Sequence, residues 1–345
     1  MNKPLLILKL GSSSIIKPDG TINEWLMNEV ASQFAQLNND YRLLLVSSGA
    51  VGFGRSQLKK FSGKLSERKA AAAIGNPILI ANYAASFKKY DLKIAQTLCE
   101  RGHFSDREKF LQLRETIETL WQNEVIPIAN ENDVVSSLEL KFSDNDELAT
   151  LMAIGFGASE LLIGTSVDGL LNNDGEVVKQ IDQFSEEIMN YATGEKSVFG
   201  LGGMISKITF ARLATSMGIK VSIFSSQKPN GIIDALNGKI GTQCTAKKSS
   251  TKARQKWLAS GSMVAGKIEI DEGAGKALQL RKSLLSVGIK NIISSFEKGE
   301  VIEILVSGNQ HSIGVARAKL SSRELKEKLG QANVEVANAS DIVLL

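Results

Sequence analysis

A single lysine inside a buried apolar run constrains this chain more than any other feature. The run Leu5-Leu6-Ile7-Leu8-Lys9-Leu10 stops at Gly11, which three serines follow. A short apolar run that ends at a glycine is typical of a buried strand. An ammonium there is costly unless an anion pairs with it, and the N–H groups after a glycine suit phosphate. We therefore expect a strand that carries a phosphate-binding lysine; the alternative is an edge strand whose lysine reaches water.

Strand-like runs and helical patterns alternate over the first two thirds of the chain. This alternation predicts an α/β fold with an open, mostly parallel sheet covered by helices on both faces. We expect an interruption of one helix near Gly75-Asn76-Pro77. The expected strands are 5–10, 42–47, 93–98, 125–129, 160–165 and 220–224, and the expected helices are 23–38, 67–89, 107–122, 148–156 and 208–217.

The composition and the pattern of apolar residues change after residue 246. Five lysines and arginines without an acid lie between residues 246 and 256, and they indicate a solvated linker over 247–262. Short strand-like runs among glycines follow, and they predict a small, mainly β domain over 263–345. The length of 345 residues fits two domains, the first over 1–246.

Composition excludes several classes of function. His103 and His311 are the only histidines, so we expect neither a zinc site nor a Ser-His-Asp triad. Cys99 and Cys244 are predicted to be reduced thiols. A net charge of +4 is too small to indicate nucleic-acid binding. We expect no membrane span and no signal peptide, and hence a cytoplasmic protein, because no apolar run approaches ~18 residues.

Polar residues gather where two expected strands end. Asn130-Glu131-Asn132-Asp133 follows the run 125–129, and Ser143–Glu147 directly precedes a helix. Ser48-Gly49-Ala50 follows another strand, at the edge where open α/β sheets bind ligands. Capping explains Asp144 or Asn145, and a turn would explain Asp133, but neither explains the whole cluster.

A second glycine-rich segment spans Phe199–Lys207 and precedes a helix. Glycines that open a helix, with a lysine in its first turn, suit a polyphosphate. The alternative is a flexible loop with a solvent-facing lysine.

Together these motifs resemble the amino acid kinase family, in particular its glutamate-phosphorylating branch. Each motif is weak alone, but five in the family's order over almost the whole chain are highly specific. The segment Gly266–Ala274 also resembles the start of a PUA domain, so the amino acid kinase fold followed by a PUA domain is implied. The five motifs are Leu8–Ser13, Val46–Ala50, Asn130–Asp133, Asp144–Asp146 and Gly202–Lys207.

The resemblance implies transfer of the γ-phosphoryl group of ATP, with Mg²⁺, to the side-chain carboxylate of L-glutamate. The product would be L-glutamyl 5-phosphate, in the first step of proline biosynthesis. No residue is implied as a metal ligand. By position, the implied catalytic residues are Lys9, Lys207 and Asp146; the glutamate-binding residues are Ser48, Asp133 and Asn145; and the ATP-binding residues are Lys9, Thr165, Ser166, Leu201, Gly202, Gly203, Met204, Ile205, Ser206 and Lys207.

Three of these positions depart from the family pattern. Ser166 stands where many members have an aspartate, which puts the nucleotide contacts there in question. Leu201 and Ile205 replace more polar residues and are expected to act through their backbone.

The family also implies partners. A homo-oligomer, either a dimer or a tetramer, and feedback inhibition by proline are expected. RNA contact by the PUA domain is not expected, because residues 264–345 carry eleven Lys and Arg against ten Asp and Glu. Two alternatives stay open: a kinase for aspartate, acetylglutamate, carbamate or a nucleoside monophosphate, and an RNA-binding protein with a vestigial kinase part.

Overall fold

The computed structural model describes residues 3–135, 144–193, 203–247, 264–296, 298–299, 301–308 and 312–344. The chain divides into two compact units, each with its own apolar core. The first contains residues 1–103 and 107–248, and the second contains residues 249–345 together with 104–106.

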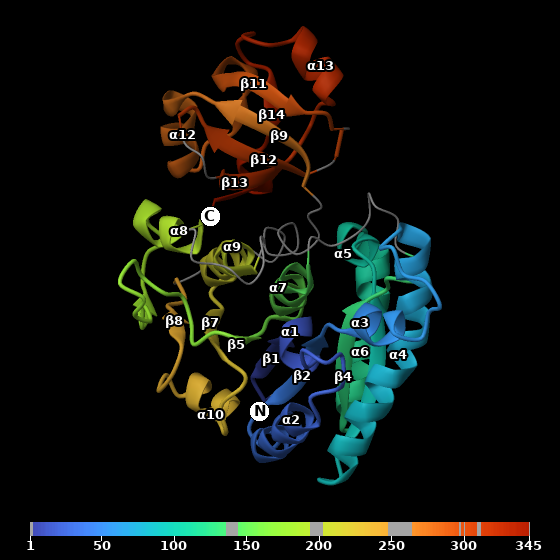
Figure 1. The fold of residues 1–345 in the computed structure, drawn as a ribbon. Coiled ribbons are helices and arrows are strands. Elements are labelled where there is room, and N and C mark those ends of the chain that lie inside the picture. Colours follow the sequence, from blue (N-terminus) through green and yellow to red (C-terminus); the bar gives the residue numbers. More distant parts are fainter. Residues whose placement is uncertain are drawn as a thin grey trace. The chain divides into compact units, whose positions relative to one another are not determined.

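An eight-stranded sheet forms the centre of the first unit (Figure 1). Its order is β3-β4-β2-β1-β5-β7-β8-β6, and the first six of these strands are parallel. Their carboxyl ends therefore meet at one edge, the usual ligand-binding edge of such sheets. The strands are β1 (Leu5–Leu10), β2 (Arg42–Ser47), β3 (Lys93–Cys99), β4 (Val125–Glu131), β5 (Glu160–Thr165), β6 (Gln180–Ile181), β7 (Lys220–Ser225) and β8 (Thr242–Cys244).

Helices cover both faces of this sheet, which confirms the predicted fold class. The long helices α2 and α4 join α10 in one apolar core against β1 and β2, whereas α7 and α9 pack together on the opposite face (Figure 1). The helices are α1 (Ser12–Ile15), α2 (Glu24–Leu37), α3 (Ala50–Arg55), α4 (Leu65–Lys88), α5 (Gly102–Ser105), α6 (Arg107–Gln122), α7 (Asn145–Phe156), α8 (Glu186–Thr193), α9 (Gly203–Ser216) and α10 (Gly231–Leu236).

The predicted interruption of α4 is wrong, because the helix runs through Gly75-Asn76-Pro77 without a break. Gly75 serves close packing instead: a Cβ atom there would lie 1.7 Å from the carbonyl oxygen of Ala50 on α3. Gly54 of α3 is equally confined, since its Cβ would lie 1.8 Å from the carbonyl oxygen of Ala71. The two glycines let α3 and α4 touch backbone to backbone.

By length and composition, α4 is the one helix among the described residues that could span a membrane. It packs into the core of the first unit, where Tyr83 and Phe87 are fully buried. Their rings meet edge to face, with centroids 6.2 Å apart. The apolar character of α4 is thus accounted for by burial.

Some expected boundaries move. The helix expected at 208–217 begins at Gly203, so Lys207 lies one turn inside α9. Five short helices of the first unit were not predicted: α1, α3, α5, α8 and α10. The linker expected at 247–262 lies outside the described residues except for Lys247.

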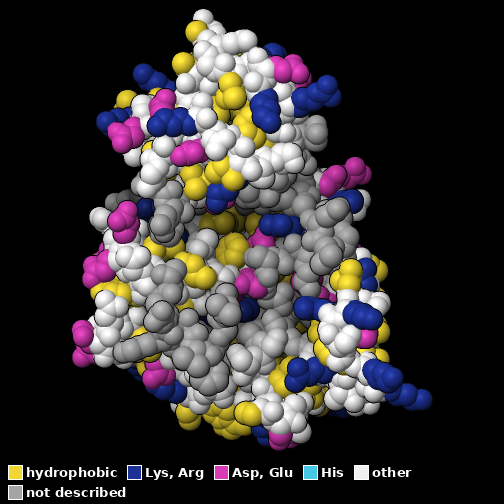
Figure 2. All heavy atoms as spheres, turned by 45° about the horizontal axis from the view of Figure 1, so that its top comes forward, with side chains coloured by type: hydrophobic (Ala, Val, Ile, Leu, Met, Phe, Trp, Pro, Cys, Tyr) yellow, Lys and Arg dark blue, Asp and Glu magenta, His cyan; other side chains and the backbone are white. Residues whose placement is uncertain are grey.

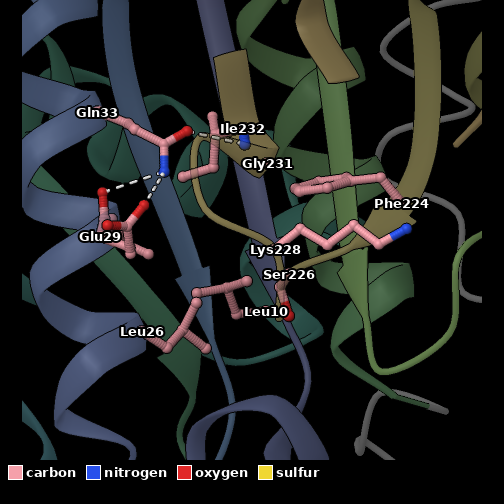
Figure 3. A pocket seen from close by; sticks show the side chains of 10 residues that line it. Leu10, Leu26, Glu29, Gln33, Phe224, Ser226, Lys228, Gly231 and Ile232 are labelled. Atoms are coloured by element: carbon pink, nitrogen blue, oxygen red, sulfur yellow. Dashed lines mark hydrogen bonds between the residues drawn. The ribbon is translucent and has the colours of Figure 1, made fainter. Parts of the chain in front are cut away.

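A small cavity of about 10 Å³ lies beside α2 and has room for about one water. Figure 3 shows the side chains that line it. Gln33 of α2 accepts hydrogen bonds there from the backbone N–H groups of Ile232 (2.9 Å) and Ile233 (3.1 Å). Its amide nitrogen donates to Glu29. The cavity marks a structural junction between α2 and the start of α10.

The second unit is mainly β, as predicted. A five-stranded sheet has the order β11-β9-β12-β13-β15, and β10 pairs with β14. On the face shown in Figure 2, Lys and Arg side chains are interspersed with Asp and Glu. The elements are β9 (Val264–Ile270), α12 (Glu272–Gln279), β10 (Leu284–Leu285), β11 (Ile289–Ser294), β12 (Val301–Val306), β13 (Ser312–Arg317), α13 (Ser322–Glu327), β14 (Glu335–Ala337) and β15 (Ile342–Leu344).

Candidate active site

Two lysines from distant parts of the chain meet on one carboxylate. Lys9 Nζ lies 2.6 Å from Asp146 Oδ1, and Lys207 Nζ lies 2.8 Å from Asp146 Oδ2. The side chains of Lys9, Asp146 and Lys207 are only 5%, 1% and 14% exposed. The alternative of water-facing lysines is wrong for both positions.

The fold explains this convergence. Lys9 is the fifth residue of the central strand β1, and Asp146 lies in the first turn of α7, which packs against that strand. Lys207 comes from α9, the neighbour of α7, and also donates to the carbonyl oxygen of Gly203 (3.1 Å). Three elements thus bring the charged groups to the carboxyl edge of the sheet.

Asp144 fixes the start of α7. Its Oδ1 accepts hydrogen bonds from the N–H groups of Asp146 (2.9 Å) and Glu147 (3.1 Å), so it is the N-cap. Its Oδ2 accepts a hydrogen bond from the hydroxyl of Ser206. The predicted capping role is confirmed, and one side chain also links α7 to the start of α9.

The charges shift each other's ionisation. Burial alone would raise the pKa of Asp146, but the adjacent charges of Lys9 and Lys207 lower it below the ordinary value. Burial lowers the pKa of Lys9, the charge of Lys207 lowers it further, and Asp146 opposes both effects. Asp146 is therefore a carboxylate near neutral pH, and each of its two oxygens faces a lysine ammonium.

A cluster of amides and hydroxyls adjoins Asp146. The side-chain nitrogen of Asn145 donates to Ser48 Oγ (2.8 Å), the backbone oxygen of Ser47 (3.0 Å) and Asn130 Oδ1 (3.0 Å). These residues come from the start of α7 and the ends of β2 and β4. The structure thus brings together three motifs that are separate in the sequence.

The remaining predicted site residues are less closely linked. Thr165 is buried at the end of β5, where its hydroxyl bonds to the backbone of Val167, and Ser166 is exposed. Asp133 lies in the turn after β4. Gly203, Met204, Ile205 and Ser206 form the half-buried first turn of α9, whereas Leu201 and Gly202 lie outside the described residues.

Comparison with known families decides the class of protein. The family model "Amino acid kinase family" matches residues 4–225, and the model "PUA domain" matches residues 266–339. The chain belongs to the amino acid kinase family. The lysine–carboxylate–lysine group therefore lies within the matched kinase region, and the mainly β unit is the PUA domain.

Within the amino acid kinase family, the chain is similar to several curated glutamate 5-kinases. A glutamate 5-kinase of Haemophilus influenzae (strain PittGG) is 36% identical over 97% of this chain and 94% of its own length. Those of Bacteroides thetaiotaomicron and Streptococcus suis are 34% and 32% identical, with 94% or more of both chains covered. A solved N-acetylglutamate synthase from Neisseria gonorrhoeae is similar in fold, with 15% identity and a TM-score of 0.52 over 72% of this chain and 61% of its own.

Two features of this amino acid kinase were not predicted as site residues. Asn130 was seen only as part of a polar motif, and Asn76 only as part of a helix break. A polar residue inside an otherwise apolar helix is a signal that could have found Asn76, whereas Asn130 ends the apolar strand β4. An ion pair between Arg101 and Glu147, next to Asp146 in sequence, was also missed.

Proposed function

We propose that this ATP-dependent kinase transfers the γ-phosphoryl group of ATP to the side-chain carboxylate of L-glutamate. The products are ADP and L-glutamyl 5-phosphate, the acyl phosphate that opens proline biosynthesis. The observation that carries the proposal is the pair Lys9 and Lys207 on the Asp146 carboxylate, beside the Asn145 amide and the Ser48 hydroxyl. The glutamate 5-kinase relatives support glutamate as the acceptor.

The residue types fit the chemistry. A glutamate side chain has a pKa of about 4.3, so it is already an anion near neutral pH and needs no general base. Two anions must approach in line, so neutralised charge and placement are the main requirements. The ammonium groups of Lys9 and Lys207 meet the first requirement, and Asp146 holds both in place.

Each side chain then has a distinct proposed role. Lys9 and Lys207 bind the phosphates and stabilise the charge on the transferred group, and Asp146 positions them. Ser48, Asp133 and Asn145 bind glutamate. Thr165, Ser166 and the segment 201–207 line the nucleotide, where the N–H groups that open α9 suit a phosphate.

Magnesium is proposed to enter with the nucleotide. Mg²⁺ keeps several waters and binds substrate phosphates with few protein ligands. Among the described residues there is no group of three or more His, Cys, Asp or Glu that could hold a metal ion, and both oxygens of Asp146 face ammonium groups. The donor set therefore fits an ion carried by ATP, where it would neutralise phosphate charge.

A trapping assay tests the function. The protein is incubated with glutamate, MgATP and hydroxylamine, which converts an acyl phosphate into a stable hydroxamate. We expect hydroxamate that depends on both glutamate and ATP. Its absence across nucleotides and divalent metals would reject the proposal.

A panel of acceptors tests the main alternative. Aspartate, acetylglutamate, carbamate and nucleoside monophosphates replace glutamate, and ADP release is followed. We expect the highest kcat/KM with glutamate; a higher value with another acceptor would reassign the substrate.

The family supports three further proposals. The protein is cytoplasmic and forms a homo-oligomer, either a dimer or a tetramer. Sedimentation would check the oligomeric state.

Proline inhibits by competing in the glutamate pocket, which should raise the KM for glutamate and leave kcat unchanged. The PUA domain serves assembly or regulation, and tight, salt-sensitive RNA binding by the full chain would contradict this.

A further inference from the structure

A chain of side-chain amides runs from the proposed glutamate pocket into the core. Asn145 Nδ2 donates to Asn130 Oδ1 (3.0 Å), and Asn130 Nδ2 donates to Asn76 Oδ1 (3.3 Å). The same oxygen of Asn76 accepts a hydrogen bond from Gln96 Nε2 (3.2 Å). Asn130 and Asn76 are 3% and 4% exposed. Since a primary amide has a donor end and an acceptor end, each member orients the next.

Asn76 is the inner anchor of this chain. It lies in the interior of α4, on the buried face that also carries Leu79 and Tyr83. Its own nitrogen, Nδ2, is buried and has no hydrogen-bond partner. A buried donor without a partner is destabilising, so an apolar residue would suit this helix position better. The oxygen, which accepts from two amides, is the useful end of the side chain.

Two hydrogen bonds orient the side chain of Asn130. Its nitrogen donates to the oxygen of Asn76 (3.3 Å), and its oxygen accepts from the backbone N–H of Glu131 (2.9 Å). Asn76 is the side-chain partner that fixes the donor end, and with it the direction of the Asn130 oxygen toward Asn145. The nitrogen of Asn145 is thereby engaged by three protein oxygens, which leaves its carbonyl oxygen as the end that can accept from a ligand. Ser48 Oγ already accepts a hydrogen bond, so its own proton can be donated.

We propose that Asn76 is a positioning residue that makes the pocket selective for an α-amino acid acceptor. Through Asn130 it sets an acceptor, the Asn145 carbonyl, beside a donor, the Ser48 hydroxyl. That pair complements an α-ammonium next to an α-carboxylate. The inference rests on the proposed function for the identity of the acceptor, glutamate.

The test compares glutamate with glutarate, which lacks only the ammonium group. Asn76→Leu removes the accepting oxygen and nearly keeps the volume; Asn76→Ala replaces it if the first variant does not fold. We expect glutamate-over-glutarate selectivity in kcat/KM to fall about tenfold, as one buried hydrogen bond would give. The KM for ATP should stay within about twofold.

Two controls separate this role from a structural one. Ser222→Ala removes a buried hydrogen bond to Gln243 (2.7 Å) between β7 and β8, and it should lower Tm without changing selectivity. Asn130→Ala should lower selectivity by itself, and Asn76→Leu should then add no further loss. A structural role would instead give additive losses.

The outcomes are distinct from those for the function. A wild-type protein that makes no hydroxamate from glutamate would contradict the proposed function, and glutamate as the ligand with it. An active wild type whose selectivity is unchanged by Asn76→Leu, or changed equally in the presence and absence of Asn130, would overturn this inference alone.

Discussion

Lys9 and Lys207, 198 positions apart in the sequence, share the two oxygens of one buried carboxylate. Neither ammonium can move far without giving up its contact with the Asp146 carboxylate inside the protein, which is unfavourable for a buried lysine. The pair is therefore held in place before any ligand arrives. Such preorganisation is the main source of catalysis where charge must be stabilised in transfer.

Loss of either lysine should impair turnover more than folding. Lys9→Met and Lys207→Met should each reduce kcat by about 100-fold or more, the usual effect of losing one preorganised electrostatic group. Steady-state hydroxamate formation measures this. Lys239→Met removes an exposed ion pair with Asp234 and should remain within about twofold of wild type; equal losses in all three variants would contradict the assignment.

Asp146 should make the protein sensitive to acid. Its pKa lies below the ordinary value of 3.8 because of Lys9 and Lys207, despite its burial. A depressed folded-state pKa gives stability that is present above pH 3.8 and is lost as pH falls through the lower, folded value. Urea unfolding at several pH values should show this fall.

Asp146→Asn should remove that pH dependence and also leave two lysines without a counter-charge. Its free energy of unfolding should be lower by about 3–5 kcal/mol near neutral pH. An acid response identical to that of the wild type would refute the assignment. Asp234→Asn is the surface control and should retain the wild-type response.

The loss of activity at high pH should reflect deprotonation of the Lys9 ammonium. Burial and the charge of Lys207 lower the pKa of this ammonium from 10.5, although Asp146 opposes them. In the free enzyme, kcat/KM for ATP should therefore decline at a pH below 10.5 as the charge is lost. Lys9→Arg stays charged, so its lower activity should show no such decline; a decline at the same pH would point to another group.

Gly11 and Gly54 should respond oppositely to a methyl group. A Cβ on Gly11 would lie 3.6 Å from Lys9 Nζ, an ordinary contact, whereas one on Gly54 would lie 1.8 Å from a backbone oxygen. Gly11→Ala should keep the wild-type Tm and raise the KM for ATP several-fold, because the methyl enters the phosphate space. Gly54→Ala should lower Tm sharply. Calorimetry should be used to measure the Tm of both variants, and steady-state kinetics on the same samples should give their KM for ATP.

Asp144→Ala should couple a loss of stability to a loss of rate. The substitution removes the N-cap of α7 and the contact with Ser206, and a lost cap is worth about 1 kcal/mol. Because Asp146 lies in the first turn of that helix, kcat should also fall, by about tenfold. Asp271→Ala removes the N-cap of α12 in the PUA domain and should lower stability alone.

Local patterns predicted the central sheet well. The run 5–10 and the helix 107–122 agree with β1 and α6 because apolar periodicity and tertiary burial coincide there. The burial of Lys9 followed from the same run. The contact of Lys9 with Asp146 and Lys207 could not be predicted from that run. No spacing rule connects Lys9 with Lys207, and only the family resemblance placed them together.

The errors arise where tertiary contacts override local propensity. Gly75-Asn76-Pro77 has the composition of a break, yet Gly75 is required by the approach of Ala50, and Asn76 by its amide partners. The short helices α1 and α3 contain too few residues to show a period. Neither class of error is visible in one window of sequence.

The carboxylate between the lysines also bears on what happens after the phosphoryl group has moved. With Asp146 ionised, the three side chains carry a net charge of +1 instead of the +2 of two isolated ammonium groups. Both products are anions, and a doubly positive cradle would retain them more strongly. In the proposed role of these lysines, the carboxylate built into the site would therefore weaken the binding of ADP and favour release of the products at the end of each cycle.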